Sequence, residues 1–171
     1  MNRCITMLAC ALALAFTGCT DDPELLPGDP DFKRDPALNI DNRSASGESR
    51  SHNMGENCMM CHQKLGPGLG MFTLATTIYD SKGVPAINAM LELYDKPPAA
   101  GGTLVKRLQG DALGNVFTTD ALPFPDAPLF PVVISADGLE RNAMPFPTIS
   151  GACNQCHRPD RRVQVMPPSA L

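Results

Sequence analysis

The 171-residue chain has no tryptophan, only two tyrosines and only three histidines, and its formal net charge at pH 7 is −4. The acidic balance excludes nucleic acid as a partner, because phosphate contacts require an excess of basic side chains. A bundle of long helices is excluded as well, because the chain contains 17 prolines and 14 glycines. A proline inside a helix costs about 3 kcal/mol, so this composition predicts turns and extended segments.

Apolar residues concentrate at the N-terminus, where they follow a short basic segment. Arg3 precedes an apolar run over residues 5–16, and Cys19 comes shortly after this run. The run is too short to span a bilayer as a permanent helix, and its layout predicts a secretory signal over residues 1–18. The sequence Phe-Thr-Gly-Cys at 16–19 resembles the bacterial lipobox, which implies that Cys19 becomes the lipidated first residue. Ordinary cleavage with an unmodified Cys19 is the alternative.

The predicted mature chain is an exported lipoprotein anchored to a membrane. Removal of Arg3 with the signal leaves 13 basic and 18 acidic side chains, a formal charge of −5. Thr20 is not the acidic residue associated with inner-membrane retention, so we expect an outer-membrane anchor and a chain that faces the periplasm or the cell surface. Residues 19–51 are polar and rich in Asp, Pro, Arg and Ser, which predicts a flexible, disordered tether.

Short apolar segments separated by turn residues occupy the middle of the chain. Residues 88–94 alternate along the chain, with Ala89, Leu91 and Leu93 on one face, as in a half-buried strand. Further strands are expected at residues 72–79, 103–108, 116–119 and 131–136. The pattern predicts a mainly β fold, a small antiparallel β-sandwich over residues 71–138.

Two segments of this region resemble a known family. Residues 79–86, Tyr-Asp-Ser-Lys-Gly-Val-Pro-Ala, together with residues 89–93, resemble the opening of the carboxypeptidase regulatory-like domains. Residues 111–117, Asp-Ala-Leu-Gly-Asn-Val-Phe, resemble the later hairpin of that family. The resemblance implies a transthyretin-like β-sandwich and says little about activity.

Four of the seven cysteines form two Cys-x-x-Cys pairs, and a histidine follows each pair directly. Cys4 and Cys10 lie in the signal and Cys19 at the lipobox, so every cysteine has an expected role. The first motif is Cys58-Met59-Met60-Cys61-His62, and the second is Cys153-Asn154-Gln155-Cys156-His157. Both resemble the attachment motif of c-type cytochromes, which implies two covalently bound c-type haems.

The spacing within each motif suits haem chemistry. Two thiols three residues apart reach the two vinyl groups on one edge of the porphyrin as thioethers, and the next residue, histidine, ligates the iron. The expected thioether residues are Cys58, Cys61, Cys153 and Cys156, and the expected proximal iron ligands are His62 and His157.

Three other roles for the four cysteines compete with haem attachment. Zinc-ribbon knuckles are normally about 15 to 20 residues apart, whereas Cys61 and Cys153 are 92 positions apart. Plain disulfides would leave both adjacent histidines unexplained. A thioredoxin-like dithiol needs a βαβ context, and none is visible in the sequence.

Few residues are available as the second axial ligand of each iron. His52 is the sole remaining histidine, and it could serve either haem. Met144 lies nine residues before the second motif in a proline-rich loop, and it is the expected methionine ligand. Met54 and Met166 are the other methionines near a motif.

The two motifs bracket the expected sandwich, with haem-binding segments at residues 52–70 and 139–171. Two haems cannot be fully buried by so small a core, and exposed haem edges suit brief docking with other redox proteins of the cell envelope. We therefore expect a dihaem c-type cytochrome that carries electrons and is not an enzyme. A small haem enzyme, a gas or redox sensor with an open iron position, and an adhesion module are the alternatives. The sequence leaves open whether the two motifs lie together or at opposite ends.

Overall fold

A computed structural model of the protein describes residues 51–167. The expected signal segment, Cys19 and the tether up to residue 50 lie outside the described residues, as do residues 168–171. Within the described range the fold is mainly β, and its seven strands form two sheets. The strands are β1 (Leu74–Tyr79), β2 (Met90–Tyr94), β3 (Leu104–Gln109), β4 (Asn115–Thr118), β5 (Phe130–Ile134), β6 (Arg141–Ala143) and β7 (Val163–Gln164).

One sheet has the strand order β4-β1-β7, and the other has the order β3-β2-β5-β6. Neighbouring strands are antiparallel except for β1 and β7, which run parallel. The prediction of a mainly β fold is confirmed, and the five expected strands correspond to β1 to β5 with ends shifted by one or two residues. β6 and β7 were not expected, and they add one strand to each sheet from within residues 139–171.

The hydrophobic core draws its residues from both sheets. Leu74 and Ile78 of β1 and Val116 of β4 are fully buried, and they belong to the same cluster as Leu91 and Leu93 of β2. The alternation in β2 therefore directs the residues that the sequence indicated toward the core. β1 lies in the middle of its sheet and supplies two of these core residues, which makes it the best-anchored element near both cysteine motifs.

Glu92 lies on the other face of β2 and is nevertheless only 2% exposed. Its carboxylate pairs with Arg107 of β3 at 2.7 Å, lies 3.9 Å from Arg141 of β6, and accepts a hydrogen bond from the Tyr94 hydroxyl at 2.6 Å. Burial and this hydrogen bond raise the pKa of Tyr94. A buried carboxylate needs such partners, so the cluster holds β2, β3 and β6 in register.

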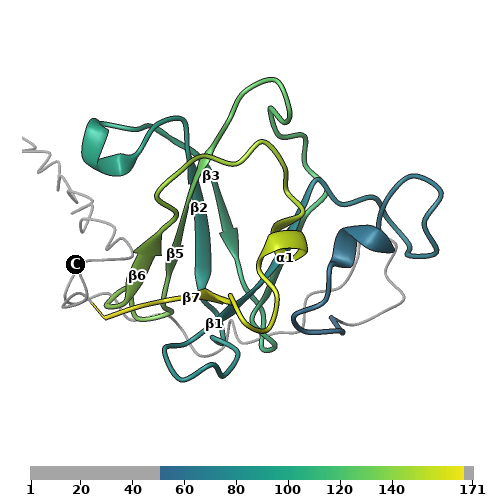
Figure 1. Ribbon diagram of the computed structural model, residues 1–171, viewed down its shortest axis with the longest axis horizontal. Helices are drawn as coiled ribbons and strands as arrows, with labels where there is room; N and C mark the ends of the chain where they lie inside the picture. Colours follow the sequence, from purple (N-terminus) through teal and green to yellow (C-terminus); the bar gives the residue numbers. More distant parts are fainter. Residues whose placement is uncertain (1–50, 168–171) are drawn as a thin grey trace, which may run out of the picture.

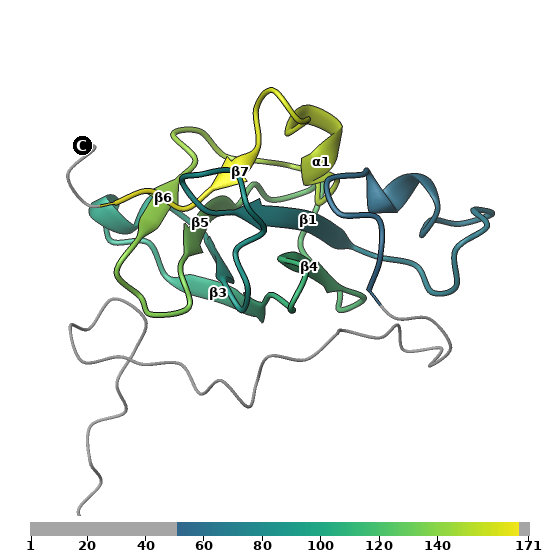
Figure 2. The ribbon, with the colours of Figure 1, turned by 90° about the horizontal axis from the view of Figure 1, so that it is seen from below.

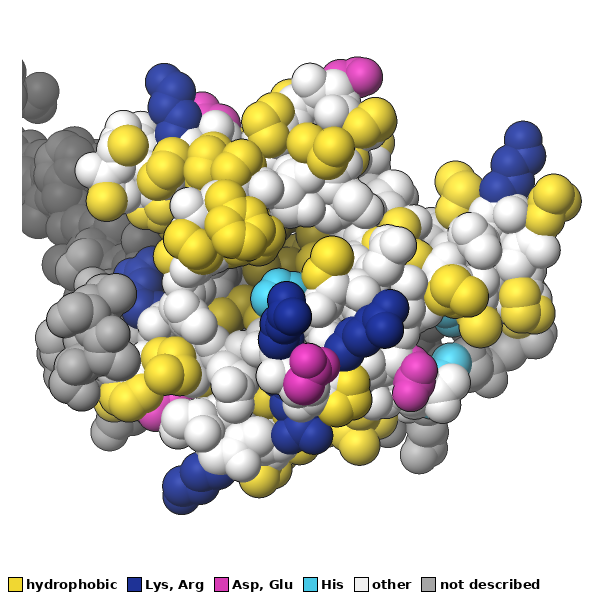
Figure 3. All heavy atoms as spheres, in the orientation of Figure 1, with side chains coloured by type: hydrophobic (Ala, Val, Ile, Leu, Met, Phe, Trp, Pro, Cys, Tyr) yellow, Lys and Arg dark blue, Asp and Glu magenta, His cyan; other side chains and the backbone are white. Residues whose placement is uncertain are grey.

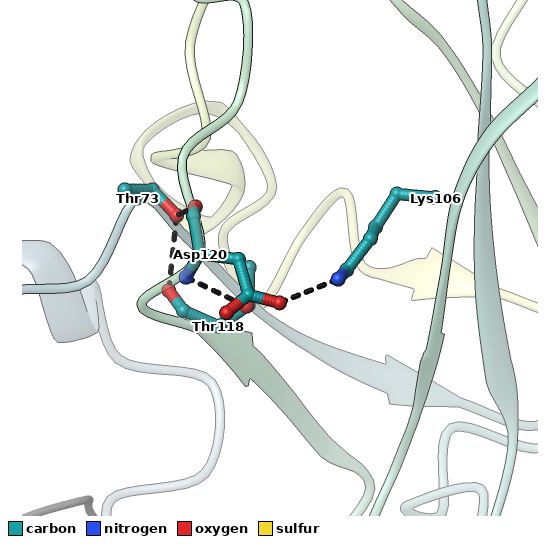
Figure 4. A network of polar contacts seen from close by, with 4 residues as sticks. All are labelled: Thr73, Lys106, Thr118 and Asp120. Carbon is teal, nitrogen blue, oxygen red and sulfur yellow. Dashed lines mark hydrogen bonds and ion pairs between the residues drawn. The ribbon is translucent and has the colours of Figure 1, made fainter.

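A polar network joins the two sheets where the chain enters β1 (Figure 4). Lys106 of β3 pairs with Asp120, which follows β4, at 2.5 Å. The hydrogen bond from Lys106 lowers the pKa of Asp120. The Thr73 hydroxyl donates to the backbone carbonyls of Thr118 and Asp120. These contacts fix the short segment that connects the first cysteine motif to β1.

Helical structure in residues 51–167 is limited to single turns, η2 (Cys58–Met60), η3 (Pro98–Ala100) and α1 (Cys153–Cys156). None of these described helices has the length or the apolar character needed to cross a membrane. Two of the three turns coincide with the cysteine motifs. Figures 1 and 2 show α1 and the blue segment that precedes β1 on the same side of the molecule.

Candidate cofactor-binding site

Each Cys-x-x-Cys-His motif begins with one helical turn, a 3-10 turn at the first motif and an α-helical turn at the second. In each, the backbone N–H of the histidine donates to the carbonyl of the first cysteine, from His62 to Cys58 at 2.8 Å and from His157 to Cys153 at 2.9 Å. Residues three and four positions apart in a helical turn share a face. The two cysteines and the histidine of each motif are therefore neighbours on one side of the turn, which is the arrangement that covalent haem attachment uses.

The two imidazoles are also oriented in the same way. Nδ1 of His62 lies 2.9 Å from the carbonyl oxygen of Leu69, and Nδ1 of His157 lies 2.9 Å from the carbonyl oxygen of Arg161. A carbonyl oxygen only accepts, so Nδ1 is the donor in both rings, and Nε2 is the nitrogen left for binding a metal. Metal-binding histidines commonly donate their other ring N–H to a backbone carbonyl in this manner.

The imidazole of the first motif is enclosed by aromatic residues. His62 is only 7% exposed, and its ring stacks on Phe72 with centroids 4.1 Å apart and an interplanar angle of 7°. Phe72 in turn stacks on Phe117 of β4 at 4.6 Å. Gly68 approaches the His62 ring so closely that a Cβ there would lie 2.8 Å from Nδ1. The ring is therefore held against the three-stranded sheet.

His52 lies beside the first motif. Its ring centroid is 6.1 Å from that of His62, with an interplanar angle of 40°, and its carbonyl accepts a hydrogen bond from Asn115 at 3.1 Å. The structure thus places His52 next to the first motif, whereas the sequence did not show which of the two motifs it lies near.

A cavity of about 300 Å³ lies beside the second motif. Cys153, Cys156 and His157 line it, and so does Met144 from the loop that follows β6. Figure 3 shows a hollow on this face that is lined by hydrophobic side chains, with a histidine and several basic side chains at its edge. The expected methionine ligand is therefore brought to the second motif. Met166 is not among the residues that line the cavity.

The second motif occupies the part of the β1 edge that β7 leaves uncovered, because β7 pairs only with the last two residues of β1. The Ala75 N–H donates to the Gly151 carbonyl at 2.9 Å, and the Thr77 N–H donates to the Asn154 side chain at 3.3 Å. These bonds satisfy backbone groups that an open strand edge leaves unpaired. The approach requires glycine at 151, because a Cβ there would lie 2.0 Å from the Thr73 carbonyl oxygen.

The thiols that lead each motif are shielded rather than activated. Burial raises the pKa of the Cys153 thiol to about 12 and raises the pKa of the Cys58 thiol as well. Reactive cysteines have lowered pKa values, and these two thiols do not share that feature. Among residues 51–167 the four cysteines form no disulfide, and no group of three or more His, Cys, Asp or Glu is arranged to hold a metal ion. The geometry of a zinc ribbon is therefore not present in this part of the chain.

Large apolar side chains near both motifs remain exposed. Those near the first motif are Met54, Met60, Leu65, Leu69 and Met71, and those near the second are Phe146 and Ile149; each is at least 46% exposed. Exposed apolar groups that gather in this way mark a surface that a ligand or a partner covers. An apolar macrocycle attached at each motif would cover such a surface, so the residues present fit the group that the motifs imply.

Three buried polar residues near the motifs were not identified from the sequence. They are Thr77 of β1, Asn115 of β4 and Asn154 of α1. The Thr77 hydroxyl donates to Asn115 at 2.6 Å and accepts from the Gly55 N–H at 2.9 Å. Asn154 donates to the carbonyl of Glu56 at 2.9 Å. Only Asn154 had a signal in the sequence, namely its position inside the second motif.

Comparisons with known proteins add no family assignment. No family model matches the chain, no curated protein matches it, and no solved structure matches it.

Proposed function

We propose that the protein is an electron carrier of the cell envelope that holds two covalently attached c-type haems. It is exported, is anchored by a lipid at Cys19, and exchanges electrons with other redox proteins. The observation that carries the proposal is the equivalence of the two motifs. Each forms one helical turn that is closed from the histidine to the first cysteine, and each histidine directs Nδ1 to a carbonyl.

The residues that would hold each haem follow from this geometry. Cys58 and Cys61 would form the thioethers at the first site, with His62 as the proximal iron ligand. His52 is the candidate for the second axial position there. When bound, each haem supplies an iron that accepts and releases one electron reversibly, with a potential tuned by its axial ligands.

At the second site Cys153 and Cys156 would form the thioethers, with His157 as the proximal ligand and Met144 as the candidate distal ligand. The chain contributes three things at both sites. It fixes the orientation of each imidazole, it excludes water from one side of each motif, and it anchors both motifs to β1.

The cavity beside the second motif favours one other candidate function. If Met144 did not ligate, the second iron would have an open position that faces this cavity, as in a haem enzyme or a gas sensor. Carbon monoxide separates the two functions, because a six-coordinate carrier binds it poorly. We expect the reduced protein to show little carbon monoxide adduct at either haem.

The proposal is tested on full-length protein produced with export and haem-attachment machinery. We expect an intact mass increased by two haems, a pyridine haemochrome spectrum of the c type, and complete reversible oxidation and reduction. A protein of unmodified mass in which the motif cysteines form two disulfides or bind zinc would exclude the proposal.

A further inference from the structure

We propose that Asn154 is a positioning residue that fixes the second haem site relative to the first. The inference rests on the proposed function, since it concerns the relation between two attachment sites. Asn154 occupies the first of the two x positions of the second Cys-x-x-Cys motif, yet it is only 5% exposed. Gln155, at the other x position, is exposed.

Both the oxygen and the nitrogen of the Asn154 side-chain amide form hydrogen bonds. Its oxygen accepts from the Thr76 hydroxyl at 3.1 Å and from the Thr77 N–H at 3.3 Å, which ties α1 to β1. Its nitrogen donates to the carbonyl of Glu56 at 2.9 Å. Glu56 lies two residues before Cys58, so this bond connects the two motifs directly across 98 positions of sequence.

The connection runs from buried Asn154 to exposed Glu56, and bonds from β1 and β4 support it independently. Thr77 and Asn115 hold residues 51–55 on the same face, through bonds to the Gly55 N–H, the Ser51 hydroxyl and the His52 carbonyl. These bonds place the first motif beside β1, and the Asn154 bond then closes the link to α1. The bonds from the Asn154 oxygen to β1 are buried, so breaking them would leave polar groups unpaired and they fix the orientation of the amide.

Loss of this link is expected to change the relation between the two haem sites and not the attachment of either haem. Without the donor at Asn154, each haem remains attached, because thioether formation uses only the cysteines. The mutual position of the two haems is then less restricted, because the segment at Glu56 is released from α1 and keeps only its bonds to Thr77 and Asn115 on the neighbouring residues 51–55. Interaction between the haems is therefore the property that depends on this residue.

The test compares Asn154→Asp with Gln155→Ala in the haem-loaded, full-length protein. Asn154→Asp keeps the oxygen that faces Thr77 and removes the donor to Glu56, whereas Gln155→Ala changes an exposed position in the same turn. Circular dichroism in the Soret region reports haem–haem coupling as a paired positive and negative band. We expect this pair in the wild-type protein and in Gln155→Ala, and a loss of at least half of its amplitude in Asn154→Asp.

Intact mass is measured on each variant, so that failure of the proposed function is seen separately as a chain without haems. An unchanged band pair in Asn154→Asp, an equal loss in Gln155→Ala, or no band pair in a wild-type protein with two haems would overturn the inference. If Asn154→Asp does not fold because it buries a charge, Asn154→Ala removes the donor to Glu56 together with the oxygen that faces β1, and the comparison with Gln155→Ala is repeated.

Discussion

The two cysteine motifs share one local structure but differ in what surrounds them. The first is enclosed, because its histidine is 7% exposed and stacks on Phe72. The second is open, because its half-buried histidine lines a cavity of about 300 Å³. The candidate distal ligands differ as well, with His52 near the first motif and Met144 near the second. The comparison teaches that the motif sets its own hydrogen-bonded turn, whereas the sandwich around it sets how exposed each histidine is.

The largest expected difference between the two regions is in stability. Phe72→Ala removes the ring on which both His62 and Phe117 stack, so we expect the free energy of unfolding to fall by about 3–5 kcal/mol. Phe146→Ala at the second motif is the matched control. Its ring is 59% exposed, and we expect a loss of about 1 kcal/mol. Denaturant unfolding of the haem-loaded variants measures both losses, and equal losses would contradict the difference in enclosure.

The next difference concerns reduction potential. A methionine ligand raises the potential of a haem relative to other axial ligands, so Met144→Ala is expected to lower one midpoint by an amount on the order of 100 mV. His52→Ala is expected to move the other midpoint potential and to leave unchanged the midpoint that Met144→Ala lowers. Stepwise potentiometric titration resolves the two haems. If both variants moved the same midpoint, the assignment of one ligand to each motif would be wrong.

The smallest expected effect is on the rate at which the protein exchanges electrons with charged redox partners. Arg158, Arg161 and Arg162 are exposed directly after the second motif, whereas Lys64 is the only basic residue within residues 51–72. Arg158→Glu combined with Arg161→Glu is expected to slow oxidation by ferricyanide severalfold at low ionic strength. Lys64→Glu is the control and should have a smaller effect. Stopped-flow rates at rising salt test the cause, because screening should abolish the difference.

The fold was predictable from the sequence where apolar residues alternate, although β2, expected to be half-buried, is buried on both faces. Residues 88–94 alternate clearly, and the structure directs Leu91 and Leu93 into the core as expected. β6 and β7 were not predictable, for a physical reason. β6 is exposed along its whole length and β7 has two residues, so neither has a periodic pattern. Both form because neighbouring strands offer free edges, which is information that a local pattern does not contain.

The residue types of the candidate site were visible in the sequence, but their arrangement was not. The spacing of cysteines and histidines indicated two attachment sites, and the structure gives both motifs the same turn. The contact between the motifs depends on Asn154, whose partner carbonyl belongs to Glu56, 98 positions away. A backbone carbonyl has no signature in the sequence. Met144 lines the cavity because of the way the loop after β6 folds. The spacing of nine residues between Met144 and Cys153 does not specify that path.

The central claim is that each motif binds its own haem, and intact mass spectrometry on two variants tests it most directly. One variant carries Cys58→Ser with Cys61→Ser, and the other carries Cys153→Ser with Cys156→Ser, both expressed with export and haem-attachment machinery. We predict a mass gain of two haems for the wild-type protein and of one haem for each variant. A variant that kept two haems, or a wild-type protein that carried none, would contradict the claim.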